Sequence, residues 1–171
     1  MTRLSALIAA LTAATYVVLV WMLVFQIKPH AGGNLPFDLL LLGYTPDDAR
    51  AFLHHLDPMG RMIYQNQVRW VDTVFPVLLA FVLGRLTFLT SSQFHLWSRV
   101  VLLVPVAGYV VMDLCENALI QELLRAGMVD FSQETARLAS QFTTTKFVLL
   151  SVSIALVLWL VVRKLKQDRF A

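Results

Sequence analysis

The sequence contains a single cysteine and few charged residues. Cys115 is the only cysteine among 171 residues, which excludes an internal disulfide and any zinc site or redox relay built from a cysteine pair. Charged residues make up 15% of the chain and apolar residues 58%, whereas about a quarter of the residues are charged in a typical soluble domain. A soluble fold of this length would bury only about 70% of its unfolded surface. The composition therefore indicates that lipid is the solvent for much of the chain.

Sequence signatures of common catalytic and metal centres are also missing. The four histidines occur in neither an HExxH nor a Glu-x-x-His pattern, and no serine lies in a recognisable nucleophile motif. The basic residues gather at the ends of apolar segments and are not interleaved with aromatic residues, so no nucleic-acid partner is expected. Motifs alone leave the catalytic residues, the metal and the cofactor unknown.

Four apolar segments are long enough to cross a membrane, because a hydrocarbon core of about 30 Å requires about 20 helical residues. They lie at about residues 4–27, 68–89, 100–120 and 143–162. The first exceeds the apolar region of a cleavable signal peptide, which has about 7–15 residues, so we expect it to remain as a span. The sequence thus predicts one all-α domain over residues 1–171, an integral membrane four-helix bundle.

Two longer connections, at about residues 28–67 and 121–142, contain signals for helix starts. Thr45 precedes Pro46 and Asp57 precedes Pro58 in the first connection, an order typical of an N-cap followed by the first helical turn. These signals predict short amphipathic helices that lie over the mouth of the bundle or in the membrane interface. Ser132 gives a similar signal in the second connection.

Prolines predict irregularities inside the spans. Pro76 removes the backbone donor that would pair with the carbonyl of Asp72, so a kink is expected beside that aspartate. Pro105 and Gly108 predict a second irregularity near the start of the third span.

Lysine and arginine residues predict the orientation of the chain. They are dense, relative to segment length, before the first span, between the second and third spans, and in the C-terminal tail. The longer connections mix basic with acidic residues. The positive-inside rule then places both termini in the cytoplasm and both longer connections outside, with the basic tail against anionic lipid headgroups.

Polar residues of the second, third and fourth spans are expected to meet below the outer surface. In the third span the polar residues are spaced by three and four positions and share one helix face. The second and fourth spans carry further charges at about the same depth. The predicted cluster consists of Arg69, Asp72, Tyr109, Asp113, Glu116, Asn117 and Lys146.

Two classes of interpretation follow for this cluster. In the structural one, the carboxylates pair with Arg69 and Lys146 and fix the helix register, since an unpaired buried charge is prohibitive. In the functional one, excess carboxylates form a proton or cation relay, a metal site that His54 or His55 completes, or a pocket for a cationic or hydroxylated amphiphile. The sequence leaves these alternatives open.

Short motifs across most of the chain beyond the first span resemble an uncharacterised family of small four-span bacterial integral membrane proteins. The motifs are Gly43-Tyr44-Thr45, Gly60-Arg61 with Tyr64, Asp72 with Phe75-Pro76, Asp113-x-x-Glu116-Asn117, and Thr143-x-x-Lys146. The resemblance implies four spans and the bacterial inner membrane, and it singles out Asp72, Asp113, Glu116, Asn117 and Lys146. It implies no activity.

The leading expectation is a small binding or accessory protein with a polar, acidic pocket near the outer leaflet. Its expected partners are the lipid bilayer, a lipid-like or cationic small molecule, and a second copy or another membrane protein. The alternatives are a membrane-embedded enzyme that acts on a lipid, with Asp113 or Glu116 as acid, base or metal ligand, and ion or proton translocation by an oligomer.

Overall fold

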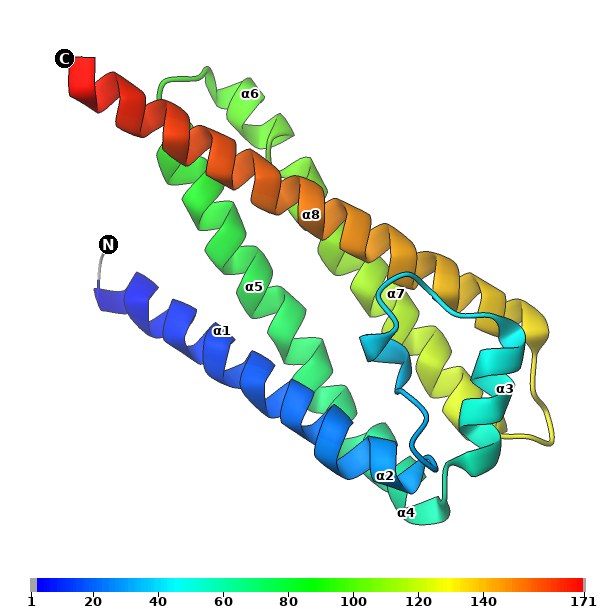
Figure 1. Ribbon diagram of the computed structural model, residues 1–171. Coiled ribbons are helices and arrows are strands. Elements are labelled where there is room, and N and C mark those ends of the chain that lie inside the picture. The colour runs from blue at the N-terminus through cyan, green and yellow to red at the C-terminus, as the bar shows by residue number, and fades with distance from the viewer. Residues whose placement is uncertain (1–2, 171) are drawn as a thin grey trace.

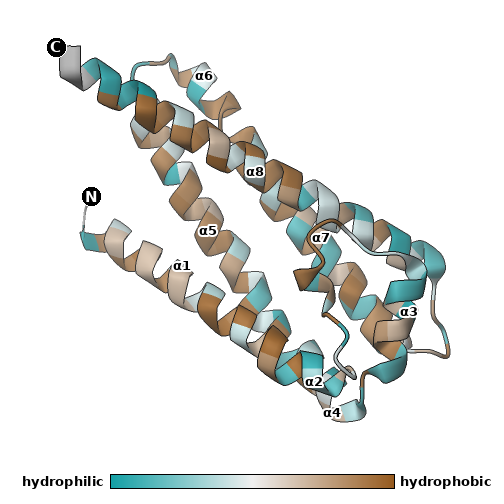
Figure 2. Cartoon of the chain, in the orientation of Figure 1, coloured by the Kyte–Doolittle hydropathy of each residue, from teal (hydrophilic) through white to brown (hydrophobic). Residues whose placement is uncertain are grey.

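The computed structural model describes the backbone of residues 3–170 and the side chains of residues 3–167, which are helical apart from short connections. Four helices are long and apolar enough to cross a membrane, as expected for a multi-pass membrane protein (Figure 1). They run over Arg3–His30, Pro58–Thr90, Leu96–Ala126 and Gln133–Gln167. Hydrophobic residues predominate along them, and hydrophilic residues gather around α3 and at the C-terminal end of α8 (Figure 2).

Each long helix contains local subdivisions. The first consists of α1 (Arg3–Trp21), the π-helical turn η1 (Met22–Ile27) and α2 (Lys28–His30). The second consists of α4 (Pro58–Ile63), the π-helical turn η3 (Tyr64–Val68) and α5 (Arg69–Thr90). The third consists of α6 (Leu96–Val101) and α7 (Val104–Ala126), and the fourth is α8 (Gln133–Phe170).

The helices do not pack evenly around the bundle. α7 lies along α8, and α5 packs against both of them (Figure 1). α1 packs closely on α5 alone, and its end at the N-terminus diverges from α8. Both termini lie at this more open end of the bundle.

The main hydrophobic core lies at the opposite end of the bundle. It joins Leu23 and Ile27 of the first helix to Phe52 of α3 (Pro46–His55) and to Leu123 of α7, all of which are almost completely buried. Phe37, in the 3₁₀ turn η2 (Phe37–Leu39), inserts into the same core. Toward the termini a much smaller cluster replaces it. The bundle is therefore closed at the α3 end.

The predicted helix starts are confirmed. The Thr45 side chain accepts from the backbone N–H of Asp48, and the Asp48 carboxylate accepts from that of Thr45, which forms a capping box at the start of α3. Asp57 caps α4 through the N–H of Gly60 at 2.7 Å, and Ser132 accepts from the N–H of Thr135 at 3.1 Å before α8.

The short helices differ in part from the expectation. α3 is a separate helix whose buried face, with Ala49, Phe52 and Leu53, packs into the core. α4 continues through η3 into α5, so it forms the beginning of the second long helix. The third helix is interrupted at residues 102–103, directly before Pro105, where an irregularity was predicted. Pro76 lies inside α5 and is buried.

Candidate functional site

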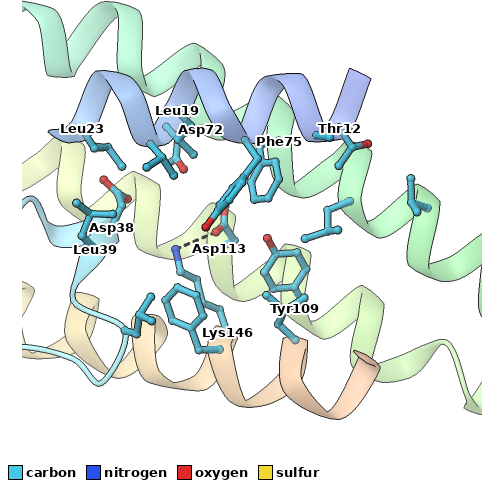
Figure 3. Close-up of a pocket in the computed structure, with 18 of the residues that line it drawn as sticks. Thr12, Leu19, Leu23, Asp38, Leu39, Asp72, Phe75, Tyr109, Asp113 and Lys146 are labelled. Carbon is cyan, nitrogen blue, oxygen red and sulfur yellow. Dashed lines mark hydrogen bonds and ion pairs between the residues drawn. The ribbon is translucent and has the colours of Figure 1, made fainter. Parts of the chain in front are cut away.

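A cavity of about 520 Å³ lies between α1 on one side and α5, α7 and α8 on the other. Most of its wall is apolar and comes from α1, α5 and α8, including Leu79 and Leu150. Polar side chains gather at one part of the wall, and Thr12 lies away from them (Figure 3). The polar lining residues of this part are Asp38, Asp72, Tyr109, Asp113 and Lys146.

Lys146 is the centre of a buried ion cluster beside the cavity. Its Nζ donates to Asp113 Oδ1 at 2.9 Å and forms a second, shorter ion pair with Glu116 Oε2. Thr143 Oγ1 donates to Glu116 Oε1 at 2.6 Å, and Asn117 Nδ2 donates to Asp113 Oδ2 at 3.2 Å. Each carboxylate thus has a charged and a neutral donor, which is the condition under which a buried ion pair is tolerated.

Helical periodicity on α7 and α8 builds this cluster. Asp113, Glu116 and Asn117 are three and four positions apart on α7, and Thr143 and Lys146 are three apart on α8, so each set shares one face. α7 and α8 lie side by side along their length. Tyr109, one turn before Asp113, is buried and lines the cavity.

Asp72 reaches the same cavity from α5. Its side chain lines the wall, and the residue is only 7% exposed. Figure 3 places it near Leu19 of α1 and close to Asp38 and Asp113. Within residues 3–167, no donor forms a hydrogen bond or an ion pair with this carboxylate. Asp72 is therefore a buried acid that lines the cavity and accepts no hydrogen bond from the described side chains.

Asp38 completes the polar part of the wall and was not among the residues predicted for it. It lies in η2, which the connection between α2 and α3 places against the bundle. The Tyr64 hydroxyl donates to Asp38 Oδ2, whereas Oδ1 is buried and has no hydrogen-bond partner among the described residues. Asp38 is the only charged residue in the otherwise apolar run of residues 35–42. That isolated charge is the signal that could have identified it.

Tyr44, at the end of the same connection, stands next to these carboxylates. Burial, together with the negative charges of Glu116 and Asp38, raises the pKa of its phenol above the ordinary value. The phenol is therefore neutral at physiological pH. The backbone N–H of Tyr44 donates to Ser140 Oγ on α8 at 2.8 Å, which ties the connection to the bundle.

Arg69 does not join the cluster. It is exposed at the start of α5 and does not line the cavity. The structure thus brings together six of the seven residues predicted to meet, and it supplies Asp38 and Tyr64 in addition. Arg69 lies three residues before Asp72, so the two side chains point about 60° apart around the helix. That difference is enough for Asp72 to be buried while Arg69 is exposed.

The histidines stay outside the cavity. His54 and His55 are exposed on α3, and the Nδ1 of His55 donates to the carbonyl of Ala51 at 2.8 Å. In the described part of the chain, no group of three or more histidine, cysteine, aspartate or glutamate side chains is placed to hold a metal ion.

The site thus combines a long apolar wall, a satisfied ion cluster and two acids that face the cavity. These features can hold a molecule that is apolar over most of its length and polar at one end.

Comparison of the chain with family models, with curated proteins and with solved structures finds no match.

Proposed function

We propose that the protein is a multi-pass protein of the bacterial inner membrane that binds an amphiphile in the cavity between α1 and α8. The apolar chain of the ligand lies along the wall formed by α1, α5 and α8, and its polar head lies at the carboxylates. The role is binding or assistance to another membrane component, without chemistry on the ligand.

The observation that carries this proposal is the mostly apolar wall of the cavity, with the charged side chains gathered at one part of it. Its volume of about 520 Å³ falls in the range of about 300–1,000 Å³ that is typical of small-molecule sites. The polar groups are few and lie at one end, as expected for groups that fix the orientation of a ligand.

Access from the lipid also supports the proposal. Ala13 and Tyr16 of α1 line the cavity and are exposed, so the cavity is open along this part of α1. α1 does not pack closely against α8. An acyl or alkyl chain can therefore enter from the side, between α1 and α8, without leaving the hydrocarbon phase.

The distribution of basic residues supports a position near the outer leaflet. At the end of the bundle that carries the termini, basic residues lie in short segments and include Arg85, Arg99 and Lys166. By the positive-inside rule this end is cytoplasmic. The polar part of the cavity lies nearer the opposite end, where α3 and η2 cover the bundle.

Native mass spectrometry of the protein, purified from its membrane in mild detergent, tests the proposal with two adjacent alanines of α1. Ala13 lines the cavity and Ala14 does not, although both are exposed. We expect the wild type and Ala14→Trp to retain one discrete lipid mass, and Ala13→Trp to lose it because the indole fills the cavity. Equal lipid retention by the three proteins would contradict the proposal. A bound lipid whose mass changes during incubation with the protein would contradict a role without chemistry on the ligand.

A further inference from the structure

The charges around the polar part of the cavity do not balance. Asp38, Asp72 and Asp113 line this part, and Glu116 lies behind them against Lys146, which is the only basic residue among the described side chains that line the cavity. Lys146 is fully engaged by Asp113 and Glu116. Its charge is thus compensated, and Asp38 and Asp72 remain without a cationic partner among the described side chains.

Burial makes this imbalance costly. Asp72 is 7% exposed and accepts no hydrogen bond within the described side chains, and Oδ1 of Asp38 is buried without a donor. A buried carboxylate without a partner lowers the stability of the fold. A buried acid at a cavity wall is therefore a candidate for contact with a ligand.

The nearest basic side chain on the same helix does not correct the imbalance. Arg69 precedes Asp72 by three residues, but its side chain is exposed and lies outside the cavity wall. Tyr64 supplies one neutral hydrogen bond to Asp38, which satisfies one oxygen and leaves the charge uncompensated.

The aromatic lining narrows the chemistry of the missing partner. Phe75, Tyr109 and Phe147 line the cavity together with the two acids. Aromatic faces and carboxylates together are the usual environment of an ammonium group, since the ring quadrupole attracts a cation. A hydroxylated head could donate to Asp38 and Asp72, whereas an ammonium head could do the same and also supply the positive charge that the described lining lacks.

We propose that Asp38 and Asp72 form the head-group subsite of the cavity and that the ligand is a cationic amphiphile, with an ammonium head on an apolar chain. This inference rests on the proposed function, because it assigns the head group of the amphiphile. The ammonium group lies between the two carboxylates, and the chain leaves along α1 toward lipid.

Photoreactive alkyl probes of equal chain length test the inference in neutral maltoside detergent. The probes carry a diazirine in the chain and differ only in the head, which is trimethylammonium, primary ammonium, hydroxyl or sulfonate. Labelled residues are located by peptide mass spectrometry. We expect the ammonium probes to label cavity residues at least about tenfold more than the hydroxyl and sulfonate probes. A tenfold difference in affinity corresponds to about 1.4 kcal/mol of binding free energy.

Asp72→Asn should abolish this preference, and Asp38→Asn should reduce it. Asp130→Asn is the matched control, because it removes the same charge from an exposed position away from the cavity; it should keep the preference. Asp72→Asn should also melt at or above the temperature of the wild type, since the amide removes an unpaired buried charge.

The outcomes separate the inference from the function on which it rests. Equal labelling of the cavity by all four probes would leave amphiphile binding intact and overturn the ammonium subsite. A lower melting temperature for Asp72→Asn would assign the carboxylate to the fold and would also overturn it. Labelling of the cavity by none of the probes would overturn both proposals.

Discussion

The buried acids of this protein fall into two groups that the sequence does not distinguish. Asp113 and Glu116 share Lys146 and have further donors in Asn117 and Thr143. Asp72 has no such donors within the described side chains. The first group explains how charge is tolerated inside the bundle, and the second is available to a ligand.

Replacement of Lys146 should show how much the ion cluster contributes to stability. Lys146→Met leaves Asp113 and Glu116 facing each other without a cation, in a region where both are almost completely buried. We expect a loss of ~3–5 kcal/mol in the free energy of unfolding, the usual effect of removing one partner from a buried pair. Denaturation in mixed micelles, followed by circular dichroism, measures this change.

Glu116→Gln provides the matched comparison. The amide oxygen can still accept from Thr143, and Lys146 keeps its ion pair with Asp113, so the remaining pair is neutral overall. This variant should lose much less stability than Lys146→Met. If the two variants were equally unstable, the two ion pairs would act as one unit, and the Lys146–Asp113 pair alone would not stabilise the cluster.

Helical spacing predicts the residues contributed by regular helices and fails for those that depend on the loop. Asp113, Glu116 and Asn117 could be placed on one face because their helix is regular from Val104 to Ala126. Asp38 could not, since no periodicity relates the connection to the bundle. Arg69 was misplaced because a three-residue step turns its side chain about 60° away from that of Asp72, and the packing of the neighbouring helices buries Asp72 and leaves Arg69 exposed.

At the scale of elements, the connection between α2 and α3 is the part of the chain on which the cavity depends most. It supplies Asp38, Leu39 and Leu41 to the wall. Phe37 packs against the rings of Tyr44 and Phe52, with centroid distances of 4.9 and 4.8 Å. The connection is thus a packed element of the site, held at both of its ends.

Gly43 lies against α8. Its φ is +87°, and an added Cβ would lie 2.7 Å from Ser140 Oγ and 2.9 Å from Thr144 Oγ1. Gly43→Ala should therefore lower the free energy of unfolding by more than the ~1–3 kcal/mol of backbone strain alone. It should also reduce labelling of the cavity by an alkyl probe, because the displaced connection carries Asp38.

Gly33→Ala is a control with the same backbone strain. Its φ is +88°, but nothing lies within 4 Å of the added Cβ. Thermal denaturation of both variants then separates strain from packing. A Gly43→Ala protein no less stable than Gly33→Ala, with unchanged probe labelling, would show that close contact with α8 does not position the connection.

Local signals predicted the helices well where they begin with a cap. Thr45, Asp57 and Ser132 each mark a helix start that the structure contains. The same signals do not reveal where a helix ends. α4 continues through η3 into α5, where Ile63 of α4 and Tyr64 and Val68 of η3 pack into the core, and this tertiary contact has no signature in the sequence.

The whole molecule is asymmetric along the bundle axis. One end of the bundle contains the main hydrophobic core and lies nearer the buried acids. The other end carries the termini and the short segments in which basic residues are not mixed with acidic ones. Composition and span length predict four helices and place both termini at the same end, and the helices are present. The spacing of the charged residues predicted a polar pocket, but the apolar part of the cavity could not be predicted in this way, since it lies where α1 diverges from α8.

The orientation of this asymmetry can be tested by cysteine labelling of intact cells in a Cys115→Ala background. Glu134→Cys lies at the start of α8 and Lys166→Cys near its other end, and both positions are exposed. Because the positive-inside rule places the basic end in the cytoplasm, a membrane-impermeant maleimide should label position 134 directly and position 166 only after permeabilisation. The reverse pattern would place the acids near the inner leaflet, and the ligand would then have to come from the cytoplasmic side.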